Sequence, residues 1–474
     1  MTRRLPGIAT CAALALAVAT CAEVTAPRPT SVATLRVIAG AAVEDTVDAL
    51  LDQALVVEAR DASGRPVPGV AISFQVDSPA YVRIGRLDEL VYLWTHAVDT
   101  TDSRGQAAVL VLLGTKAGLG HVVATDTTSH AEVTAEYTVR AGAAASVDAG
   151  PADSALYVGH SYALRGVVSD RRGNPRPDSV VFTIPAGMAA VSLNGATVRG
   201  EQIGRGYVLA TSGALVDTAW VSVVPQGTIA AYGLGGVVVT GLDGSSYHLL
   251  YRQDPLEDAA ELQPQWSPAG DQVAFVSFSE VWVVDTGGAA RRVHGGAPAV
   301  DHSFPLQYSA DGAWIYFSQA GGIGRVRSDG SAIETLPAVW PAAGPSPSPS
   351  GDSVAYRLDA SLAILDLASG ITTQLPIYGN EPRWSPAGDW IAFRDRADQL
   401  NVIRPDGSGR RLIGGMVTNA DFGWSPDGRW LIYSATHYNL DGLPVFELFL
   451  VSVSSGVVLP LEYSHGLLEP SWRR

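Results

Sequence analysis

Three carboxylates in the C-terminal half of the chain are the side chains best placed for chemistry. Glu381 and Glu469 each open a short phrase that ends in tryptophan, Glu-Pro-Arg-Trp and Glu-Pro-Ser-Trp, and Asp421 lies between them. Enzymes that hydrolyse glycosidic bonds use such carboxylates in pairs, about 5 to 10 Å apart around a pocket. Their spacing in the folded protein therefore distinguishes a glycan-active site from a shallow funnel that only binds.

Ser161 is a second candidate for chemistry, within Gly-His-Ser-Tyr-Ala at residues 159–163. The pattern imitates the turn that exposes the serine nucleophile of a hydrolase, and that turn requires a helix directly after the serine. Residues 162–168 alternate as a strand instead. The sequence favours a strand-to-strand step over a nucleophile.

The sequence contains no other constellation suited to metal, nucleotide or cofactor binding. Its nine histidines are scattered, and there is no His-Glu-x-x-His, P-loop or dinucleotide fingerprint. The 32 basic and 47 acidic residues give a net charge of -15, which disfavours wrapping a polyanion. We expect no metal, no cofactor and no nucleic-acid partner.

The elements that must position these residues are β-strands. The chain has 474 residues with 47% apolar content, 50 glycines and 29 prolines, enough for about three domains with cores of their own. Apolar residues fall in short runs between turn-forming residues, and helical spacing is absent beyond the extreme N-terminus. The composition and pattern predict an all-β fold.

The first twenty residues have the pattern of an export signal. Arg3 and Arg4 precede an apolar stretch, residues 8–19, that is too short to cross a bilayer as a helix. Residues 1–20 are therefore predicted to be a signal peptide rather than a membrane anchor.

The end of this segment resembles the lipobox of bacterial lipoproteins. Val-Ala-Thr-Cys ends at Cys21, the position that is acylated and becomes the mature N-terminus in that class, although Thr20 departs from the usual small residue. The resemblance implies a lipid anchor in the outer membrane and a short tether at residues 21–31, and leaves the periplasmic or surface face open. Cleavage after Ala22 as a free secreted protein is the alternative.

Two β-sandwiches are predicted before the C-terminal region, at residues 32–141 and 142–225. The first contains Asp-Ala-Ser-Gly-Arg-Pro-Val-Pro-Gly-Val at residues 61–70 and Thr-Asp-Ser-Arg-Gly-Gln-Ala at residues 101–107. These phrases resemble the immunoglobulin-like (BIG-type) domains of bacterial invasins. The second segment repeats the plan around Arg-Gly-Asn at residues 172–174 and resembles that class less closely.

A phrase of the type Trp-Ser-Pro-x-Gly recurs at intervals of about 40 residues, a period typical of propeller blades. Serine, proline and glycine fit the first, second and fourth positions of a type I turn, so the phrase is predicted to be a hairpin turn. Four short strands follow the pattern in each unit. The residues in the tryptophan slot, predicted to be buried structural residues, include Trp266, Trp384, Trp424 and Trp472.

These units resemble the WD40-like repeats of the TolB propeller, over residues 226–474. The resemblance implies a six-bladed β-propeller in which the C-terminal strand, ending at Trp472, completes the first blade. The third full repeat has Pro347 in the tryptophan slot within a Pro-Ser run, so its first strand is expected to be short or displaced.

Loops at one end of such a propeller are the expected binding face, because loops carry function more often than strands do. The favoured function is a non-catalytic, membrane-anchored protein of the bacterial envelope that binds a protein or peptide partner. A glycan-binding or glycan-active propeller and a purely structural surface spacer are the alternatives. The candidate binding residues are His302, Trp340, Tyr378, Glu381, Asp421, His437, Tyr438, His465 and Glu469.

Overall fold

The computed structural model describes residues 31–87, 94–152, 154–253, 262–320, 322–417, 422–438, 444–464 and 466–473. These residues form β-strands and one short 3-10 turn, Glu462–Ser464, as the all-β prediction requires. Within them, no helix has the length and apolar character needed to cross a membrane. The predicted signal peptide, Cys21 and most of the tether lie outside the described residues. Contacts divide the chain into two compact units, Met1–Ala144 with Ser169–Arg176, and Ala145–Val168 with Pro177–Arg474.

The first unit contains a sandwich of two sheets around one core. Strand β7 shows why the sheets pack, because buried and half-buried residues alternate along its whole length, as expected when one face of a strand is covered. Phe74 and Tyr137 are the largest side chains in the core and are fully buried. One sheet has the order β1 (Thr34–Ala39), β3 (Leu55–Arg60), β7 (Gln106–Leu113) and β5 (Val82–Gly85); the other has β2 (Val43–Thr46), β9 (Glu132–Arg140), β8 (Gly118–Asp126), β4 (Ala71–Val76) and β6 (His96–Thr100).

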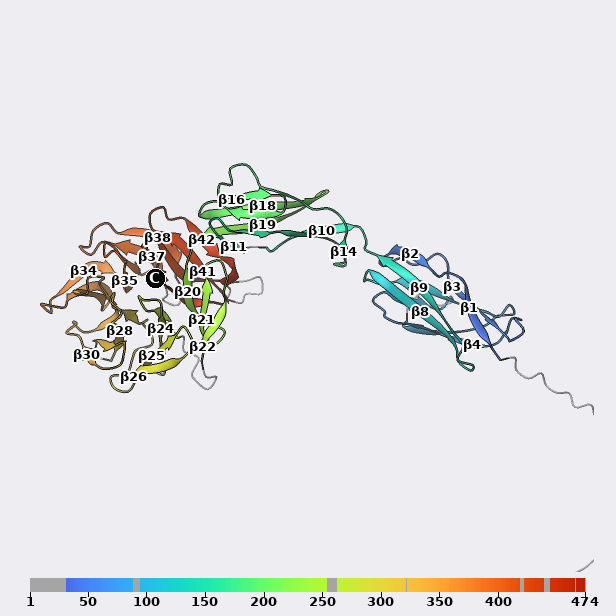
Figure 1. The fold of residues 1–474 in the computed structure, drawn as a ribbon, viewed down its shortest axis with the longest axis horizontal. Coiled ribbons are helices and arrows are strands. Elements are labelled where there is room, and N and C mark those ends of the chain that lie inside the picture. Colours follow the sequence, from blue (N-terminus) through green and yellow to red (C-terminus); the bar gives the residue numbers. More distant parts are fainter. Residues whose placement is uncertain are drawn as a thin grey trace, which may run out of the picture. The chain divides into compact units, whose positions relative to one another are not determined.

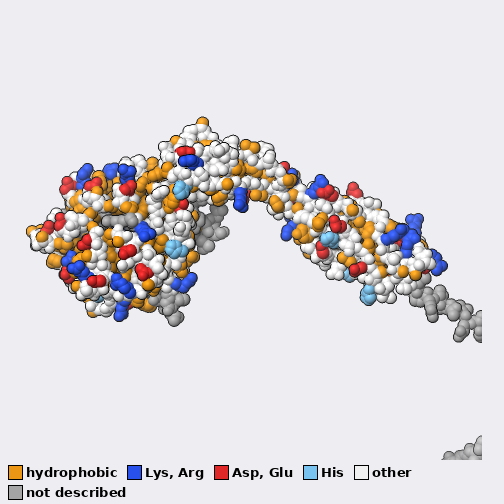
Figure 2. Space-filling model, in the orientation of Figure 1, with side chains coloured by type: hydrophobic (Ala, Val, Ile, Leu, Met, Phe, Trp, Pro, Cys, Tyr) orange, Lys and Arg blue, Asp and Glu red, His pale blue; other side chains and the backbone are white. Residues whose placement is uncertain are grey.

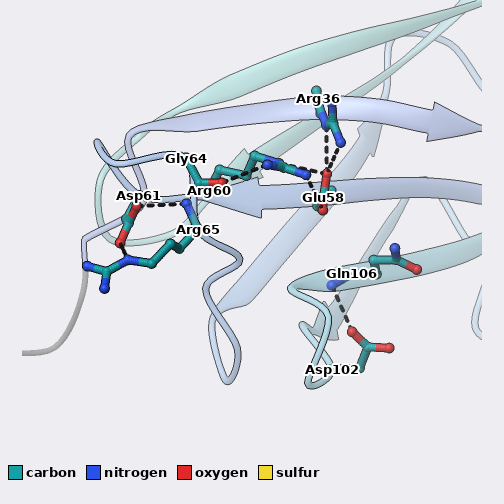
Figure 3. Close-up of polar contacts among 8 residues, drawn as sticks. All are labelled: Arg36, Glu58, Arg60, Asp61, Gly64, Arg65, Asp102 and Gln106. Carbon is teal, nitrogen blue, oxygen red and sulfur yellow. Dashed lines mark hydrogen bonds and ion pairs between the residues drawn. The ribbon is translucent and has the colours of Figure 1, made fainter.

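Aspartates close the turns of this unit (Figure 3). Asp61 Oδ1 accepts the Arg65 amide at 2.9 Å, and Asp102 Oδ1 accepts the Gln106 amide at 3.0 Å. Hydrogen bonds, first from the Ser63 hydroxyl, lower the pKa of Asp61 to about 2. The same figure shows Glu58, buried on β3, as the acceptor of guanidinium groups from both neighbouring arginines. The aspartate of the repeated Asp-x-x-Gly pattern therefore stabilises a turn by accepting hydrogen bonds from its backbone amides.

A second set of three sheets follows. Ser161 begins β12, is exposed, and is followed by the strand β13 instead of a helix, so the context of a hydrolase nucleophile is absent around it. The strand orders are β10 (Ala144–Gly150), β13 (Arg165–Asp170), β14 (Pro175–Arg176); β11 (Ser154–Tyr157), β19 (Leu215–Val224), β18 (Gly204–Ser212), β15 (Val181–Thr183); and β12 (Ser161–Ala163), β17 (Thr197–Gly200), β16 (Val191–Asn194).

The described residues from 228 onward form six four-stranded antiparallel sheets, which Figure 1 shows arranged around a common axis as in a propeller. We number the sheets 1 to 6 in chain order. Sheet 1 contains β20 (Thr228–Gly233), β21 (Gly236–Gly241), β22 (His248–Arg252) and β43 (Leu468–Trp472); sheet 2, β23 (Gln265–Trp266), β24 (Gln272–Ser277), β25 (Glu280–Asp285) and β26 (Ala290–His294); sheet 3, β27 (Gln307–Tyr308), β28 (Trp314–Gln319), β29 (Gly322–Arg327) and β30 (Ile333–Thr335). Sheet 4 contains β31 (Ala342–Pro347), β32 (Ser353–Leu358), β33 (Ser361–Asp366) and β34 (Thr372–Tyr378); sheet 5, β35 (Asn380–Trp384), β36 (Ile391–Arg394), β37 (Gln399–Ile403) and β38 (Arg411–Met416); sheet 6, β39 (Phe422–Trp424), β40 (Trp430–Tyr438), β41 (Pro444–Ser452) and β42 (Val458–Leu461).

The repeated phrase forms the turn between the first two strands of each sheet that carries it. In sheet 6, the Ser425 hydroxyl donates to Asp427 Oδ1 at 2.6 Å and accepts the amide of Trp430 at 2.9 Å. Gly428 follows at φ 69°, a conformation that favours glycine. Serine, aspartate and glycine are thus all required by the local geometry of one turn, which explains their recurrence.

The first and last strands of the propeller region close the ring of sheets. Strand β43 pairs antiparallel with β20, with Ile229 opposite Trp472 and Ala230 opposite Ser471. The Arg473 amide also donates to the Thr228 carbonyl at 2.8 Å. This pairing confirms the prediction that the C-terminal strand completes the first sheet.

Strand β31 differs from expectation. Its six residues are all buried, so the first strand of sheet 4 is neither short nor displaced. It pairs only with β32, and its register shifts between Ala343 and Ser346. An edge strand with a bulge tolerates Pro345 and Pro347, because the missing N–H groups would not have entered the ladder.

The sheet that contains β11 and β19 packs directly on the propeller within the second unit. Strand β19 ends at Val224 and β20 begins at Thr228, which leaves three residues between them. The Tyr157 hydroxyl donates to the Gly227 carbonyl at 2.8 Å. Tyr157 also lies against the apolar core of sheets 1 and 6.

Candidate functional site

The innermost strands of sheets 1, 2, 3, 5 and 6 line a small cavity at the end where the Ser-Pro turns lie. This central cavity has a volume of about 100 Å³. Two prolines of the Ser-Pro turns, Pro268 and Pro386, border it. Its aromatic lining residues are Trp266, Tyr308, Trp384, Trp424 and Trp472.

The tryptophans of the repeated phrase therefore pack between neighbouring sheets and also line the cavity. Trp266 and Trp472 are 7% and 6% exposed and belong to the apolar cores between sheets. Trp384 and Trp424 are half-buried. The Trp424 indole donates to the Arg383 carbonyl at 2.9 Å, which links sheet 6 to sheet 5.

Serines one residue before the tryptophan slot join neighbouring sheets around the cavity. The Ser471 hydroxyl oxygen accepts the Trp266 amide at 3.0 Å, and that of Ser346 accepts the Trp384 amide at 3.0 Å. Each bond connects the innermost strand of one sheet with that of the next. These strands are positioned by side chains of the adjacent sheet, since no further strand lies inside them.

Among the described residues that line the central cavity, Arg383 is the one cation and none is an aspartate or a glutamate. Its side chain is 5% exposed, and its guanidinium lies 5.8 Å from the ring centre of Phe422. The sequence analysis missed this residue because arginine in the middle of a short strand gives no local signal. Its place at the cavity depends on the innermost strands of five sheets that are far apart in the sequence.

Glu381 lies at the opposite end of β35 from Trp384 and is 2% exposed. Its Oε1 accepts the guanidinium of Arg394 at 2.8 Å and the amide of Asn380 at 3.0 Å. Burial raises the pKa of Glu381 to about 7, although the charges of Arg394, Arg383 and Arg357 act to lower it. Of these three guanidinium groups, that of Arg394 is in direct contact with the Glu381 carboxylate.

Glu469 has the corresponding position on β43 and is 1% exposed. Its Oε2 accepts the amide of Gln263 at 2.6 Å, which ties sheet 1 to sheet 2. Glu381 and Glu469 both have positive φ, 51° and 57°, ahead of a proline. Neither borders the central cavity, and Asp421 lies outside the described residues. Glu381 and Glu469 are therefore joined to their own neighbours and do not border that cavity.

The other described candidate residues lie at the ends of strands or in the connections between sheets. His302 is exposed, Trp340 is 72% exposed and Tyr378 is 36% exposed, with Arg396 stacked on the Tyr378 ring at 5.0 Å. His437 and Tyr438 lie in the backbone pairing of β40 with β41, but their side chains, like His465, lie outside the description.

Strand direction places these connections together. In a four-stranded antiparallel sheet, the start of the first strand, the turn between the second and third strands and the end of the fourth share one end. Leu234, Phe278 and Met416 also occupy such positions, with 67%, 63% and 61% exposure. The sequence analysis missed these three, and an apolar residue at such a turn was the available signal. We define the rim as Leu234, Phe278, Trp340, Tyr378 and Met416.

In the described part of the chain, no three His, Cys, Asp or Glu side chains lie close enough together to hold a metal ion.

The comparisons with known proteins give structural likenesses only. No protein-family model and no curated protein sequence matches the chain. TolB from Acinetobacter baumannii aligns with a TM-score of 0.44 and 14% identity, over 62% of this chain and 82% of that one. A protein described as TolB from Agrobacterium tumefaciens aligns with a TM-score of 0.40 and 20% identity, over 50% and 89%. A protein of unknown function from Bacteroides thetaiotaomicron aligns with a TM-score of 0.33 and 10% identity, over 90% and 86%.

Proposed function

We propose that this chain is a non-catalytic protein of the bacterial envelope whose six-bladed, TolB-like propeller binds a protein or peptide at the rim. In this proposal residues 1–20 are a signal peptide, Cys21 carries the lipid anchor, and residues 21–31 form a tether. Immunoglobulin-like domains at residues 32–141 and 142–225 form a stalk for the propeller at residues 226–474.

The rim is the observation that carries the binding proposal. Its side chains are large, apolar or aromatic, and each is at least one-third exposed. Trp340 is 72% exposed and Phe278 is 63% exposed, so neither side chain is part of the hydrophobic core. Aromatic side chains and methionine are enriched in protein interfaces. The composition of the rim therefore fits a protein or peptide partner.

Charge does not favour a polyanionic partner or a carboxylate-based active site. On the face seen in Figure 2, acidic and basic side chains of the propeller are interspersed and do not gather into a patch of one sign. Glu381 and Glu469 are both almost fully buried, so a bulky sugar chain would not reach them. This burial favours the binding protein over the glycan-active alternative.

The stalk is supported by a plan that both N-terminal sandwiches share. Near the start of each, a short strand pairs parallel with the last strand of the domain, β2 with β9 and β11 with β19. The contacts of Tyr157 with the Gly227 carbonyl and with the apolar core of sheets 1 and 6 then join the second of these domains to the propeller.

The rim is tested by replacing Phe278, Trp340 and Tyr378 together with alanine. We expect capture of a binding partner from envelope extract to fall about tenfold or more, because a few aromatic anchors carry most of the affinity of an interface. The melting temperature should stay within about one degree, since these exposed side chains contribute little to the core. Cross-linking with mass spectrometry and scanning calorimetry provide the two readouts.

A matched control replaces Ile371 and Val457, which are 65% and 49% exposed on connections at the turn end of the sheets. Their alanine variant should capture the partner as the parent does. Equal loss in both variants, or none in the rim variant, would contradict a binding face at the rim.

The lipid anchor is tested by Cys21→Ala. We expect the variant to leave the membrane fraction and to lose metabolic labelling with palmitate, because a thiol at that position is the attachment point of the acyl groups in the lipoprotein class that the sequence resembles. Both cysteines, Cys11 and Cys21, lie in the predicted leader region, so Cys11→Ala is the matched control and should change neither readout. Undiminished labelling of the Cys21 variant would contradict the anchor.

A further inference from the structure

A second pocket lies at the turn end of the propeller, between sheets 4 and 5. We propose that this turn pocket binds an organic cation, an ammonium group on a short carbon chain, with Asp352 as its charged partner. The cation comes from a lysine side chain of another protein or from a free amine. The site is independent of the proposed function, because the turn pocket and the rim lie at opposite ends of the sheets.

Three turns build the turn pocket. The Ser-Pro turn of sheet 4 lies against that of sheet 5, where a Cβ on Gly388 would be 3.7 Å from Pro349 Cδ. Pro405, in the turn between β37 and β38, adds a further wall. The volume is about 330 Å³, and small-molecule sites occupy about 300 to 1,000 Å³. The pocket is therefore large enough for a ligand of its own.

Asp352 supplies the charge of the turn pocket. Its Oδ1 accepts the hydroxyl groups of Ser348 at 3.0 Å, Ser350 at 2.8 Å and Ser353 at 2.9 Å. These bonds, that from Ser350 first, lower the pKa of Asp352, so the carboxylate is ionised at neutral pH. All three hydroxyls bond to Oδ1, which leaves Oδ2 to accept from a ligand.

The turn of sheet 4 holds its aspartate with more bonds than the matching turns do. In sheets 2 and 5 the corresponding Asp271 and Asp389 each accept one serine hydroxyl, at 2.7 and 2.8 Å. Alanine stands in those two turns where sheet 4 has Ser350. A carboxylate that is already oriented loses less conformational entropy when a ligand binds. The extra serines therefore favour a binding role for Asp352 beyond the closure of its turn.

The charges around Asp352 favour a cation. Hydrogen bonds from Ser369 lower the pKa of Asp366, and the charge of Asp352 opposes them. The two carboxylates thus repel each other, and a cation bound at Asp352 would relieve the repulsion. Among the described residues that line the pocket, Asp352 is the one with a charge; Arg404, in the third turn, stacks on the Trp390 ring at 4.9 Å.

The walls favour an organic cation over an inorganic one. Trp384 borders the pocket, and tryptophan is the aromatic side chain that attracts cations best. Pro349, Pro405 and Ala387 offer hydrocarbon surface to a carbon chain. A cavity of about 150 Å³ holds benzene, so this larger pocket accommodates an ammonium group on a chain as long as that of lysine.

The test is a titration of the full-length chain with n-butylammonium chloride at constant ionic strength, followed by saturation-transfer NMR of the ligand. We expect a saturable signal. Asp352→Asn should weaken binding about tenfold or more, because the amide still accepts from the serines but the charged partner of the ammonium group is lost. Asp271→Asn is the matched control, since Asp271 occupies the same position in the turn of sheet 2. Its titration should match that of the parent.

A second variant tests the space and leaves the charge in place. Ala387 is exposed and lines the pocket, so Ala387→Leu should fill the pocket without disturbing a core. We expect n-butylammonium binding to fall about tenfold or more while Asp352 is intact. Ala269 is also exposed and has the same position in the turn of sheet 2, so Ala269→Leu should bind as the parent does.

Further probes separate the sources of the cation. Displacement of n-butylammonium by lysine blocked at its α-amine and carboxyl groups would assign the pocket to a side chain of a partner protein; binding of n-butylammonium without such displacement would assign it to free amines. Both results support the site. Neutral n-butanol binding as tightly as n-butylammonium, displacement by calcium chloride at the same ionic strength, an undiminished titration in the Asp352→Asn or Ala387→Leu variant, or the absence of a saturable signal with the folded parent would overturn it.

Discussion

Removal of residues 467–474 is expected to open the propeller and to lower its melting temperature sharply. All five residues of β43 are buried, and Trp472 belongs to the core shared by sheets 1 and 6. The deletion also removes two side-chain oxygens that accept hydrogen bonds from backbone amides, Glu469 Oε2 from Gln263 and Ser471 Oγ from Trp266. These bonds join β43 of sheet 1 to sheet 2 and the segment just before it. Truncating a single buried tryptophan costs roughly 3 to 5 kcal/mol, so losing the whole strand should cost more.

Calorimetry and size-exclusion chromatography measure the two consequences, a lower melting temperature and association through the exposed edge of β20. A synthetic peptide of residues 467–474 added in trans should restore part of the lost stability, because it can refill the same edge. A truncated chain that stays monomeric and melts within about one degree of the parent would show that β43 does not hold the ring closed.

Glu381→Gln is expected to make the propeller less sensitive to pH. The pKa of Glu381 is raised from 4.5 to about 7, chiefly by burial. An acid with a raised pKa in the folded state supports folding fully below pH 4.5 and loses that contribution as the pH rises through about 7. The loss amounts to roughly 3 kcal/mol at most. Glutamine keeps an acceptor for Arg394 and carries no charge. The stability of the variant relative to that of the parent should therefore rise between about pH 5 and about pH 8.

Glu58→Gln is the control of opposite sign. Hydrogen bonds from Arg60 and Arg36 hold the pKa of Glu58 below 4.5. That carboxylate therefore stabilises the first sandwich above pH 4.5, and the contribution is lost as the pH falls through its folded-state pKa. Denaturation of parent and variants from about pH 3 to about pH 8 extends into both windows and gives the comparison. If the stability of the Glu381 variant follows that of the parent at every pH, the claim that burial raises the pKa of Glu381 is wrong.

The hairpin turns and the ring closure could be predicted from the sequence because each has a local or repeated signature. Ser425, Asp427 and Gly428 fulfil separate requirements of one turn, and any chain that repeats the turn must repeat those residues. The closure followed from a repeat divided between the two ends of the region, in which a motif strand ends at Trp472 without successors.

The interior of the propeller could not be predicted in the same way. Glu381 and Glu469 were assigned to a binding face because they lie near loops, but they are buried, with hydrogen bonds to Arg394 of the same sheet and to Gln263 ahead of sheet 2, and both have a positive φ. Arg383 was overlooked, since its place at the cavity depends on the innermost strands of four other sheets, which are distant in sequence. The prolines of β31 suggested a broken strand, and only its edge position makes them acceptable. These features are set by long-range packing, which periodicity does not record.

The pairing of β43 with β20 also determines when this protein can finish folding. The ring needs contacts such as Ile229 with Trp472, between residues at the two ends of the propeller region, and such distant contacts slow folding because a long loop must close first. A ribosome releases the chain from its N-terminal side, so the clasping strand is the last described strand to emerge. Until then sheet 1 has an uncovered edge, and we expect the nascent propeller to depend on chaperones that shield unpaired strands.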